Sequence, residues 1–181
     1  PPPDGEPPAP EEIQTAINNA PPGSTIVIPA DTYTQVGAFE ISTPNLTIKL
    51  SDGTVIQNSA PCFEVTADNV TITSETIGGA VCMPTNGSDG IVVSDGVEGL
   101  RIFGIEITGI DPENSENTSG DGIHFAGGIE GVVLADNKIH GLDGDGIEFV
   151  ESPTGIVDIH GNLFQDNGGF GINNSDTSSP T

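Results

Sequence analysis

Short segments that alternate apolar and polar residues recur along the chain at a nearly constant spacing. These segments are FEIS (39–42), FEVT (63–66), GIVVS (90–94), GIHFA (122–126), GIEFV (146–150) and GINN (171–174). Counted from the first apolar residue of each, they lie 24 (39 to 63), 28 (63 to 91), 32 (91 to 123), 24 (123 to 147) and 25 residues (147 to 172) apart. Such alternation is typical of a strand with one buried and one exposed face.

A second segment rich in β-branched residues follows each of the first five. These are NLTIKL (45–50), NVTITS (69–74), GLRIFGIEI (99–107), GVVLADNKI (131–139) and GIVDIHGNLF (155–164). The extra length of the two longer repeats falls in residues 82–89 and 111–120, which we expect to be loops.

Strands that return about every 24 residues are too close together for helices to lie between them. They can stack in parallel only by winding into a solenoid, in which each coil lies about 4.8 Å above the last. Like residues should then stack on like: Phe39 on Phe63, Asn45 on Asn69, Ile48 on Ile72, and Asn137 on Asn162.

One helix is expected before the first strand, over residues 11–20. Its apolar residues recur at helical spacing, acids occupy its first turn, and PPG (21–23) ends it. The Pro-rich residues 1–10 read as an arm or linker, residues 11–174 as one solenoid domain, and residues 175–181 as a polar C-terminal tail.

The opening IQTAINNAPPGSTIVIPADTYT, the FEI…NLTIKL segment and the repeated GDGI…DNKI units resemble the right-handed parallel β-helix of the pectin-lyase-like superfamily. The resemblance extends over residues 11–174. It implies an all-β fold, a right-handed parallel β-helix of about six coils with a short N-terminal capping helix. It also implies secretion and a bias toward polysaccharides, as lyases, hydrolases, epimerases, binding proteins, adhesins or tailspikes, without selecting one activity.

The charge of the chain limits its partners. The 27 Asp and Glu residues outnumber three Lys and Arg residues, which gives a formal net charge of -24. Phosphate recognition needs clustered cations, whereas Lys49, Lys138 and Arg101 are scattered, so nucleic acid is excluded as a partner. No apolar stretch approaches the roughly 20 residues of a membrane span, so no membrane insertion is expected.

Acidic residues recur at the turn before three successive strands. Asp89, Asp121 and Asp145 each precede a glycine there, and stacking would place neighbouring carboxylates about 5 Å apart. Like charges at that distance repel by roughly 3 kcal/mol at an effective dielectric of about 20, and a cation would relieve the repulsion. With Asp143 as a further ligand, the column predicts a Ca²⁺ site. The alternative is that Asp-Gly pairs simply suit tight turns.

The resemblance also points to catalytic candidates, all of them weak. Polygalacturonase-like members carry carboxylates where Asp121 and Asp145 stand, but Gly144 replaces the third acid and residues 167–171 lack the expected histidine. Pectate-lyase-like elimination needs a basic residue, and Arg101 has no Lys beside it. His124 should face outward near Glu148, where the pair could bind a sugar hydroxyl. We therefore expect no catalytic site.

Cys62 and Cys82 lie 20 residues apart, at the beginning and end of one coil. Stacking would bring their backbones close, and in a secreted chain with two cysteines a disulfide is expected. Its closed loop would contribute roughly 3 kcal/mol of stability.

The last repeat, GINN, runs straight into polar residues without a capping helix. An open end exposes unpaired backbone groups and apolar side chains, which favours contact with another chain. Our first hypothesis is a secreted or cell-surface structural or adhesive subunit that assembles head-to-tail with copies of itself. The contacts would involve the N-terminal prolines (Pro1, Pro2 and Pro3) together with Phe170 and Ile172. The alternative is a secreted polysaccharide-binding or polysaccharide-processing module that uses Ca²⁺.

Overall fold

Three parallel sheets wind around a common core in the computed structural model, which describes residues 6–35, 37–109 and 120–176. Sheet A contains β1 (Thr25–Ile28), β4 (Thr47–Leu50), β7 (Thr71–Ser74), β10 (Arg101–Phe103), β13 (Val132–Ala135) and β16 (Val157–His160). Sheet B contains β2 (Thr32–Gln35), β5 (Val55–Asn58), β8 (Ala80–Pro84), β11 (Ile105–Thr108), β14 (Lys138–His140) and β17 (Leu163–Gln165). Sheet C contains β3 (Phe39–Ile41), β6 (Phe63–Val65), β9 (Ile91–Val93), β12 (Ile123–Phe125), β15 (Ile147–Phe149) and β18 (Ile172–Asn174).

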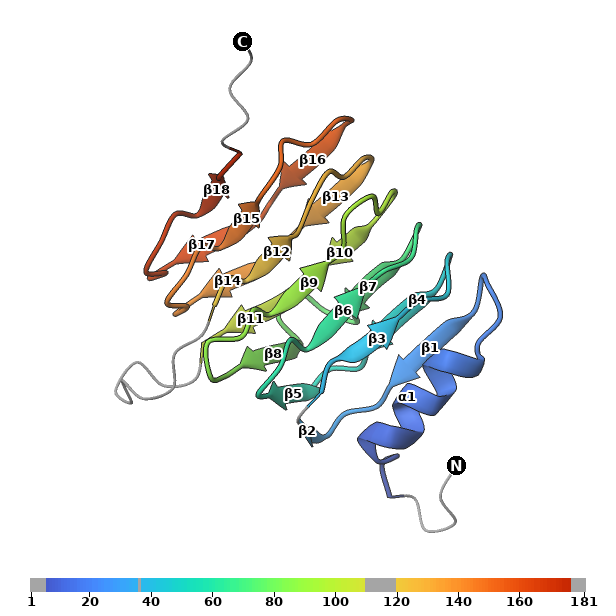
Figure 1. Cartoon of the computed structure of the whole chain (residues 1–181). Coiled ribbons are helices and arrows are strands. Elements are labelled where there is room, and N and C mark those ends of the chain that lie inside the picture. Colours follow the sequence, from blue (N-terminus) through green and yellow to red (C-terminus); the bar gives the residue numbers. More distant parts are fainter. Residues whose placement is uncertain (1–5, 36, 110–119, 177–181) are drawn as a thin grey trace.

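Each coil contributes one strand to each sheet, and each strand pairs in parallel with its equivalent in the next coil (Figure 1). The expected register is confirmed: Phe39 pairs with Phe63, and Ile48 pairs with Ile72. The prediction of an all-β parallel β-helix of about six coils is therefore confirmed.

The two recurring segments of each repeat correspond to three strands. The first segment is the sheet C strand, whereas the second spans both a sheet A and a sheet B strand, such as β10 and β11 within residues 99–107. Only Gly104, at a φ of 67°, separates these two strands. Because this corner is a single residue, no run of polar residues separates the two strands in the sequence. The sequence pattern therefore shows them as one segment.

The corner between sheets C and A has the same conformation in successive coils. Asn45, Asn69, Gly99 and Gly131 occupy equivalent positions there, with φ values of 61°, 55°, 69° and 67°. Glycine and asparagine are the residues that adopt this left-handed region at least cost. The sharp turn therefore selects these residue types in these four coils.

The inward side chains of the three sheets form one apolar core along the rod. The rings of Phe39 and Phe63 stack across two coils with centroids 5.9 Å apart, and those of Phe125 and Phe149 lie 4.8 Å apart. Burying each large side chain of this kind contributes about 1.5–3 kcal/mol. Cys62 and Cys82, both fully buried, form a disulfide inside this core, with Cα atoms 6.0 Å apart.

Helix α1 (Pro10–Asn19) covers the N-terminal end of the core (Figure 1). Ile13 and Ile17 are buried against the first coil. The Gln14 amide Nε2 donates to the Glu40 carbonyl at 3.0 Å, and the Glu40 N–H donates to Gln14 Oε1 at 2.9 Å. This side chain therefore takes the place of a neighbouring strand at the edge of sheet C. No helix in the described part of the chain is long and apolar enough to cross a bilayer.

The opposite end of the rod, formed by β16, β17 and β18, has no such cover in the described part of the chain. Inward positions of the last coil, which are buried in the coils below, are here open to solvent. Ile172 is 47 % exposed, while the Ile147 on which it stacks is fully buried. Val157, Ile159 and Phe164 are likewise only partly buried.

The corner between sheets A and B is held by stacked asparagines. Asn137, which is 1 % exposed, donates from Nδ2 to the Ile102 carbonyl at 3.0 Å and accepts the Ile105 N–H at Oδ1 at 3.0 Å. Its own N–H donates to Asn162 Oδ1 at 2.9 Å, so the expected Asn137–Asn162 stack is confirmed. These bonds satisfy backbone groups that the corner removes from the sheets.

Replacing Asn137 by Ala should lower the free energy of unfolding by about 2–4 kcal/mol, because Ile102 O and Ile105 N–H would lose their partner inside the protein. Urea denaturation followed by circular dichroism measures the loss. Asn19→Ala, at an exposed position at the end of α1, is the control and should change stability by less than about 0.5 kcal/mol. Equal losses in the two variants would contradict the role given to the stacked asparagines.

Candidate functional site

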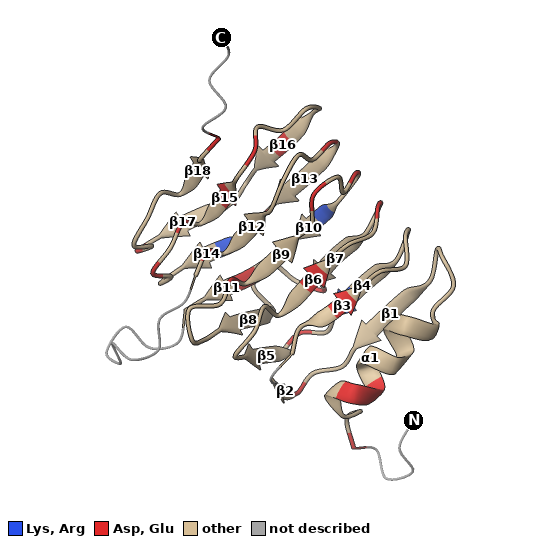
Figure 2. Ribbon diagram, in the orientation of Figure 1, with Lys and Arg blue, Asp and Glu red and all other residues tan. Residues whose placement is uncertain are grey.

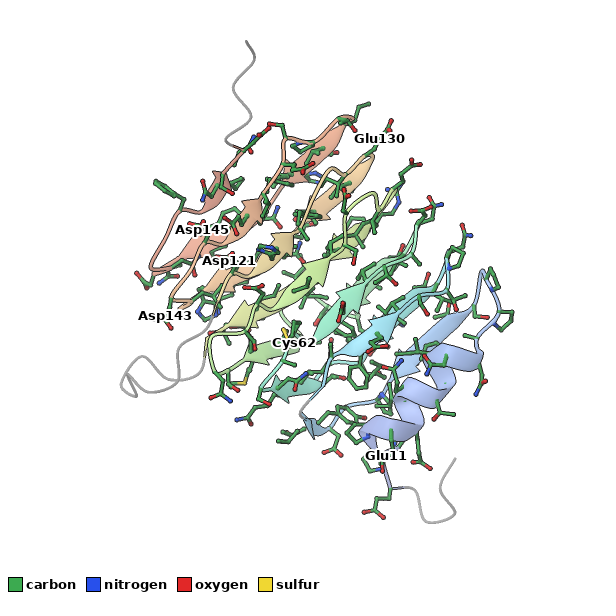
Figure 3. All side chains as sticks on the ribbon, in the orientation of Figure 1. Glu11, Cys62, Asp121, Glu130, Asp143 and Asp145 are labelled. Carbon is green, nitrogen blue, oxygen red and sulfur yellow. A yellow bond between two sulfur atoms is a disulfide. The ribbon has the colours of Figure 1, made fainter. Side chains whose placement is uncertain are left out.

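Three aspartates lie one above another at the turn that leads into sheet C. Asp89, Asp121 and Asp145 precede β9, β12 and β15, and the paired strands place them at equivalent positions. Figure 3 shows Asp121 and Asp145 on successive coils, with Asp143 farther out on the turn. The column expected from the sequence is therefore present.

Each carboxylate of this column binds the backbone of the next coil. The Asp121 N–H donates to Asp89 Oδ1 at 2.8 Å, the Asp145 N–H donates to Asp121 Oδ1 at 2.6 Å, and the Phe170 N–H donates to Asp145 Oδ1. Hydrogen bonds from N–H groups to an ionised carboxylate are among the stronger ones in proteins. A backbone donor therefore lies between successive negative charges and offsets their repulsion.

The glycines on either side of these aspartates are required by the same stacking. A Cβ on Gly144 would lie 2.3 Å from Asp121 Oδ1, and a Cβ on Gly122 would lie 2.4 Å from the Gly146 carbonyl. The first glycine of each Gly-Asp-Gly turn has no Cβ and thus leaves space for the carboxylate of the coil below. The second admits the backbone of the coil above.

His124 lies between two carboxylates on the outer face of sheet C. Its Nδ1 is 3.0 Å from Glu148 Oε2 and 3.4 Å from Asp121 Oδ2. Strand pairing places His124 beside Val92 on one side and Glu148 on the other, as the repeat predicted. All three side chains are partly buried, so the cluster combines solvent access with a fixed geometry.

A metal ion could be held at one point of this face. Among the described residues, Asp89, Asp121 and His124 place one candidate ligand atom each within 4.8 Å of one another. Asp145 and Asp143 are not in this group. Asp145 already accepts from Phe170 at Oδ1 and from Asn173 Nδ2 at Oδ2, the latter at 2.7 Å.

The donor set bears on which ion would fit. Ca²⁺ takes six to eight oxygen ligands, whereas this group supplies two carboxylates and an imidazole nitrogen. Imidazole is more typical of Zn²⁺ and other transition ions. Three acids of the loop before Asp121 are further candidates for oxygen ligands, and all lie outside the described residues: Asp111, Glu113 and Glu116.

The catalytic candidates separate into two kinds. Asp145 is 9 % exposed, and both of its carboxylate oxygens accept hydrogen bonds from the last coil. Asp121, His124 and Glu148 are adjacent and reach the surface. Arg101 stands beside Thr71 and Val133, on another sheet, and does not join them.

A second charged cluster lies on the outer face of sheet B, and the sequence reading missed it. Glu106 Oε1 is 2.7 Å from Lys138 Nζ and 2.6 Å from His140 Nε2. Burial raises the pKa of the Glu106 carboxyl, but the hydrogen bonds and charges of Lys138 and His140 outweigh it, so the pKa is below its ordinary value. Glu106 and Lys138 are 32 positions apart in the sequence, and only the register of β11 on β14 reveals their contact.

Two substitutions of Asp121 separate its structural role from its charge. Asp121→Ala removes the acceptor of the Asp145 N–H and should lower the free energy of unfolding by about 1–3 kcal/mol. Asp121→Asn keeps an oxygen at that place and should lose less than half as much. Denaturant titration of both variants at neutral pH gives the comparison. Equal losses would mean that the negative charge, and not the hydrogen bond, matters.

Comparison with known proteins gives a family and no individual relative. A model of the right-handed beta helix region matches residues 37–181. No curated protein and no solved structure matches the chain. The matched part covers most of the coils described above. The chain therefore belongs to the right-handed β-helix family.

Proposed function

We propose that this chain is a non-catalytic structural subunit that associates with a second copy through the C-terminal end of its β-helix. The observation that carries the proposal is that no described residue covers the C-terminal end of the core. Phe170 is 69 % exposed and Ile172 is 47 % exposed, and within residues 6–35, 37–109 and 120–176 the last strand of each sheet has an unpaired edge. Apolar side chains and free edge groups together favour pairing with another β-edge.

The two ends of the rod are not complementary, which bears on how copies would join. The outer side of α1 is polar, with Glu11, Glu12, Thr15 and Asn18 exposed, and Gln14 already occupies the edge of β3. The head-to-tail contact expected from the sequence would place an apolar end against this polar helix. Contact between two C-terminal ends, related by a two-fold axis, matches like with like. Pro1, Pro2 and Pro3 lie outside the described residues, and their part in assembly stays a prediction.

The charge of the chain opposes this contact and makes it salt-dependent. Acidic residues lie along the whole rod, whereas Lys and Arg are few (Figure 2). A net charge of -24 on each copy repels the other until salt screens it, with a Debye length of about 8 Å at physiological ionic strength. Association should therefore strengthen as salt is added.

A secreted or cell-surface location belongs to the same proposal. The buried Cys62–Cys82 disulfide supports it, because such bonds persist in oxidising compartments. The acidic surface supports it as well, since net repulsion keeps an exported subunit soluble before it meets its partner.

Light scattering after size-exclusion chromatography tests the assembly. We expect a dimer whose fraction rises with protein and salt concentration. Phe170→Asp should weaken dimerisation at least about tenfold, since it places a charge at the contact. Ile77→Asp is the matched control: Ile77 is 71 % exposed on a turn away from the C-terminal end, and the variant adds the same charge. A monomer at high protein and salt concentration, or equal weakening by both variants, would contradict the proposal.

A second candidate function is polysaccharide binding on the outer face of sheet C. The position of His124 between Asp121 and Glu148 favours it, because these groups offer donors and acceptors for sugar hydroxyls on a fixed strand face. A bound divalent cation would assist if the glycan is acidic. Catalysis is not part of this candidate, because Asp145 is occupied by backbone and side-chain donors.

Glycan-array binding tests this second candidate. The double variant His124→Ala and Glu148→Gln should lose at least about tenfold in affinity, because it removes the imidazole and the negative charge of Glu148. His160→Ala is the control, since His160 Nδ1 lies 3.0 Å from Asp158 on another sheet and should not matter. If the wild-type chain binds no glycan with or without divalent ions, the candidate is wrong.

A further inference from the structure

The chain contains two Asn-Gly steps, Asn86-Gly87 and Asn167-Gly168. In such a step the backbone nitrogen of the glycine can attack the asparagine side chain, because glycine has no side chain to hinder the approach. The reaction needs that nitrogen and the side-chain amide to be free to meet. Hydrogen bonds to either group hold the reactants apart.

Asp-Gly steps can form the same ring, and stacking of the coils protects nearly all described Asn-Gly and Asp-Gly steps from this reaction. The glycine N–H of each described Asp-Gly step donates to a neighbouring coil: Gly53 to Gly79 O, Gly90 to Asp121 O, Gly96 to Gly128 O, Gly122 to Asp145 O, Gly144 to Gly120 O and Gly146 to Phe170 O. At Asn167-Gly168 the protection is more complete. The Gly168 N–H donates to Leu142 O at 2.7 Å, Asn167 Oδ1 accepts the Leu142 N–H at 3.3 Å, and Asn167 Nδ2 donates to Ile139 O at 3.2 Å.

Asn86-Gly87 is the exception among the described Asn-Gly and Asp-Gly steps. It forms the tip of the longer turn between β8 and β9, closed by the Ser88 N–H donating to Thr85 O at 3.1 Å. Both residues have positive φ, 57° and 76°, and both are exposed. Among the described residues, neither the Asn86 amide nor the Gly87 N–H has a hydrogen-bond partner.

From this difference we propose that Asn86 is a site of spontaneous deamidation in the folded protein. The Gly87 nitrogen bonds to Asn86 Cγ, the bond from Cγ to Nδ2 breaks, and ammonia leaves with the proton of the Gly87 N–H. The result is a cyclic succinimide. Water then opens the ring at either carbonyl and leaves aspartate or isoaspartate. No electrons are transferred, and water is the only co-reactant.

The modification would act on the candidate site. The new carboxylate lies three residues before Asp89, the first member of the acidic column. An isoaspartyl link also lengthens the backbone within the turn, just before Ser88, whose carbonyl accepts the Gly120 N–H at 2.7 Å. Deamidation at Asn86 thus changes both the charge and the support of the Asp89–Asp121 pair. This inference does not depend on the proposed function.

Peptide mapping by mass spectrometry tests the proposal on the intact, disulfide-bonded chain. The chain is produced in a host without N-glycosylation, because Asn86-Gly87-Ser88 is also a sequon and a glycan would block Nδ2. It is incubated at mildly alkaline pH, and isoaspartate is confirmed with an isoaspartyl methyltransferase. We expect Asn86 to convert at least about tenfold faster than Asn167, because Asn167 reacts only after local opening.

Unfolding the chain provides the matched reference. In urea, with the disulfide reduced, the two Asn-Gly steps should convert at similar rates, which shows that folding causes the difference. Equal rates at Asn86 and Asn167 in the folded chain would overturn the proposal. So would an unreactive Asn86 in the folded chain, if both sites convert in urea.

Discussion

The backbone hydrogen bonds between consecutive coils are the constraint on which the rest of this molecule depends. They fix the coil spacing at about 4.8 Å, and every side chain at a corner must fit within that distance. The Gly-Asp-Gly turns follow from it, because a Cβ at Gly122 would approach the Gly146 carbonyl to 2.4 Å. The buried Asn137 follows from it as well, because the corner between β10 and β11 removes backbone groups from the sheets and its side-chain amide satisfies them.

The same constraint gives part of the acidity a structural role. Besides the Asp89 column, the Asp52 carboxylate accepts the Thr76 N–H at 3.0 Å and the Asp68 carboxylate accepts the Glu98 N–H at 2.9 Å. In each case the acceptor belongs to one coil and the donor to the next. A short, ionised side chain at a turn is thus a general means of joining coils here. The repulsion within the Asp89 column is offset by the donors that lie between its members.

The fold could be predicted from the sequence, because in a solenoid the same pattern of apolar and polar residues recurs in every coil. The alternation of apolar and polar residues in 39–41 and 63–65 was enough to predict that Phe39 stacks on Phe63, and the geometry of the corners was not needed. It was insufficient where contacts depend on the corner geometry. The split between β10 and β11 at Gly104 went unnoticed, and so did the contact of Glu106 with Lys138 and His140. The candidate metal group was predicted only in part, since Asp89 and Asp121 were expected but His124 was not.

In a periodic fold, functional residues are best sought where the residue type changes along a column of equivalent positions. Residues that recur in every coil are already explained by the needs of the fold. On the outer face of sheet C, Glu40 and Glu64 stack on Val92, and then His124 and Glu148 follow. His124 is thus an interruption in a row that the fold does not require to contain an imidazole. Phe170 is a second interruption, since it occupies the next place above Asp145 where an aspartate would continue the ladder. A carboxylate there would have no further coil in the described chain to bind, whereas an exposed ring is suited to contact with a partner.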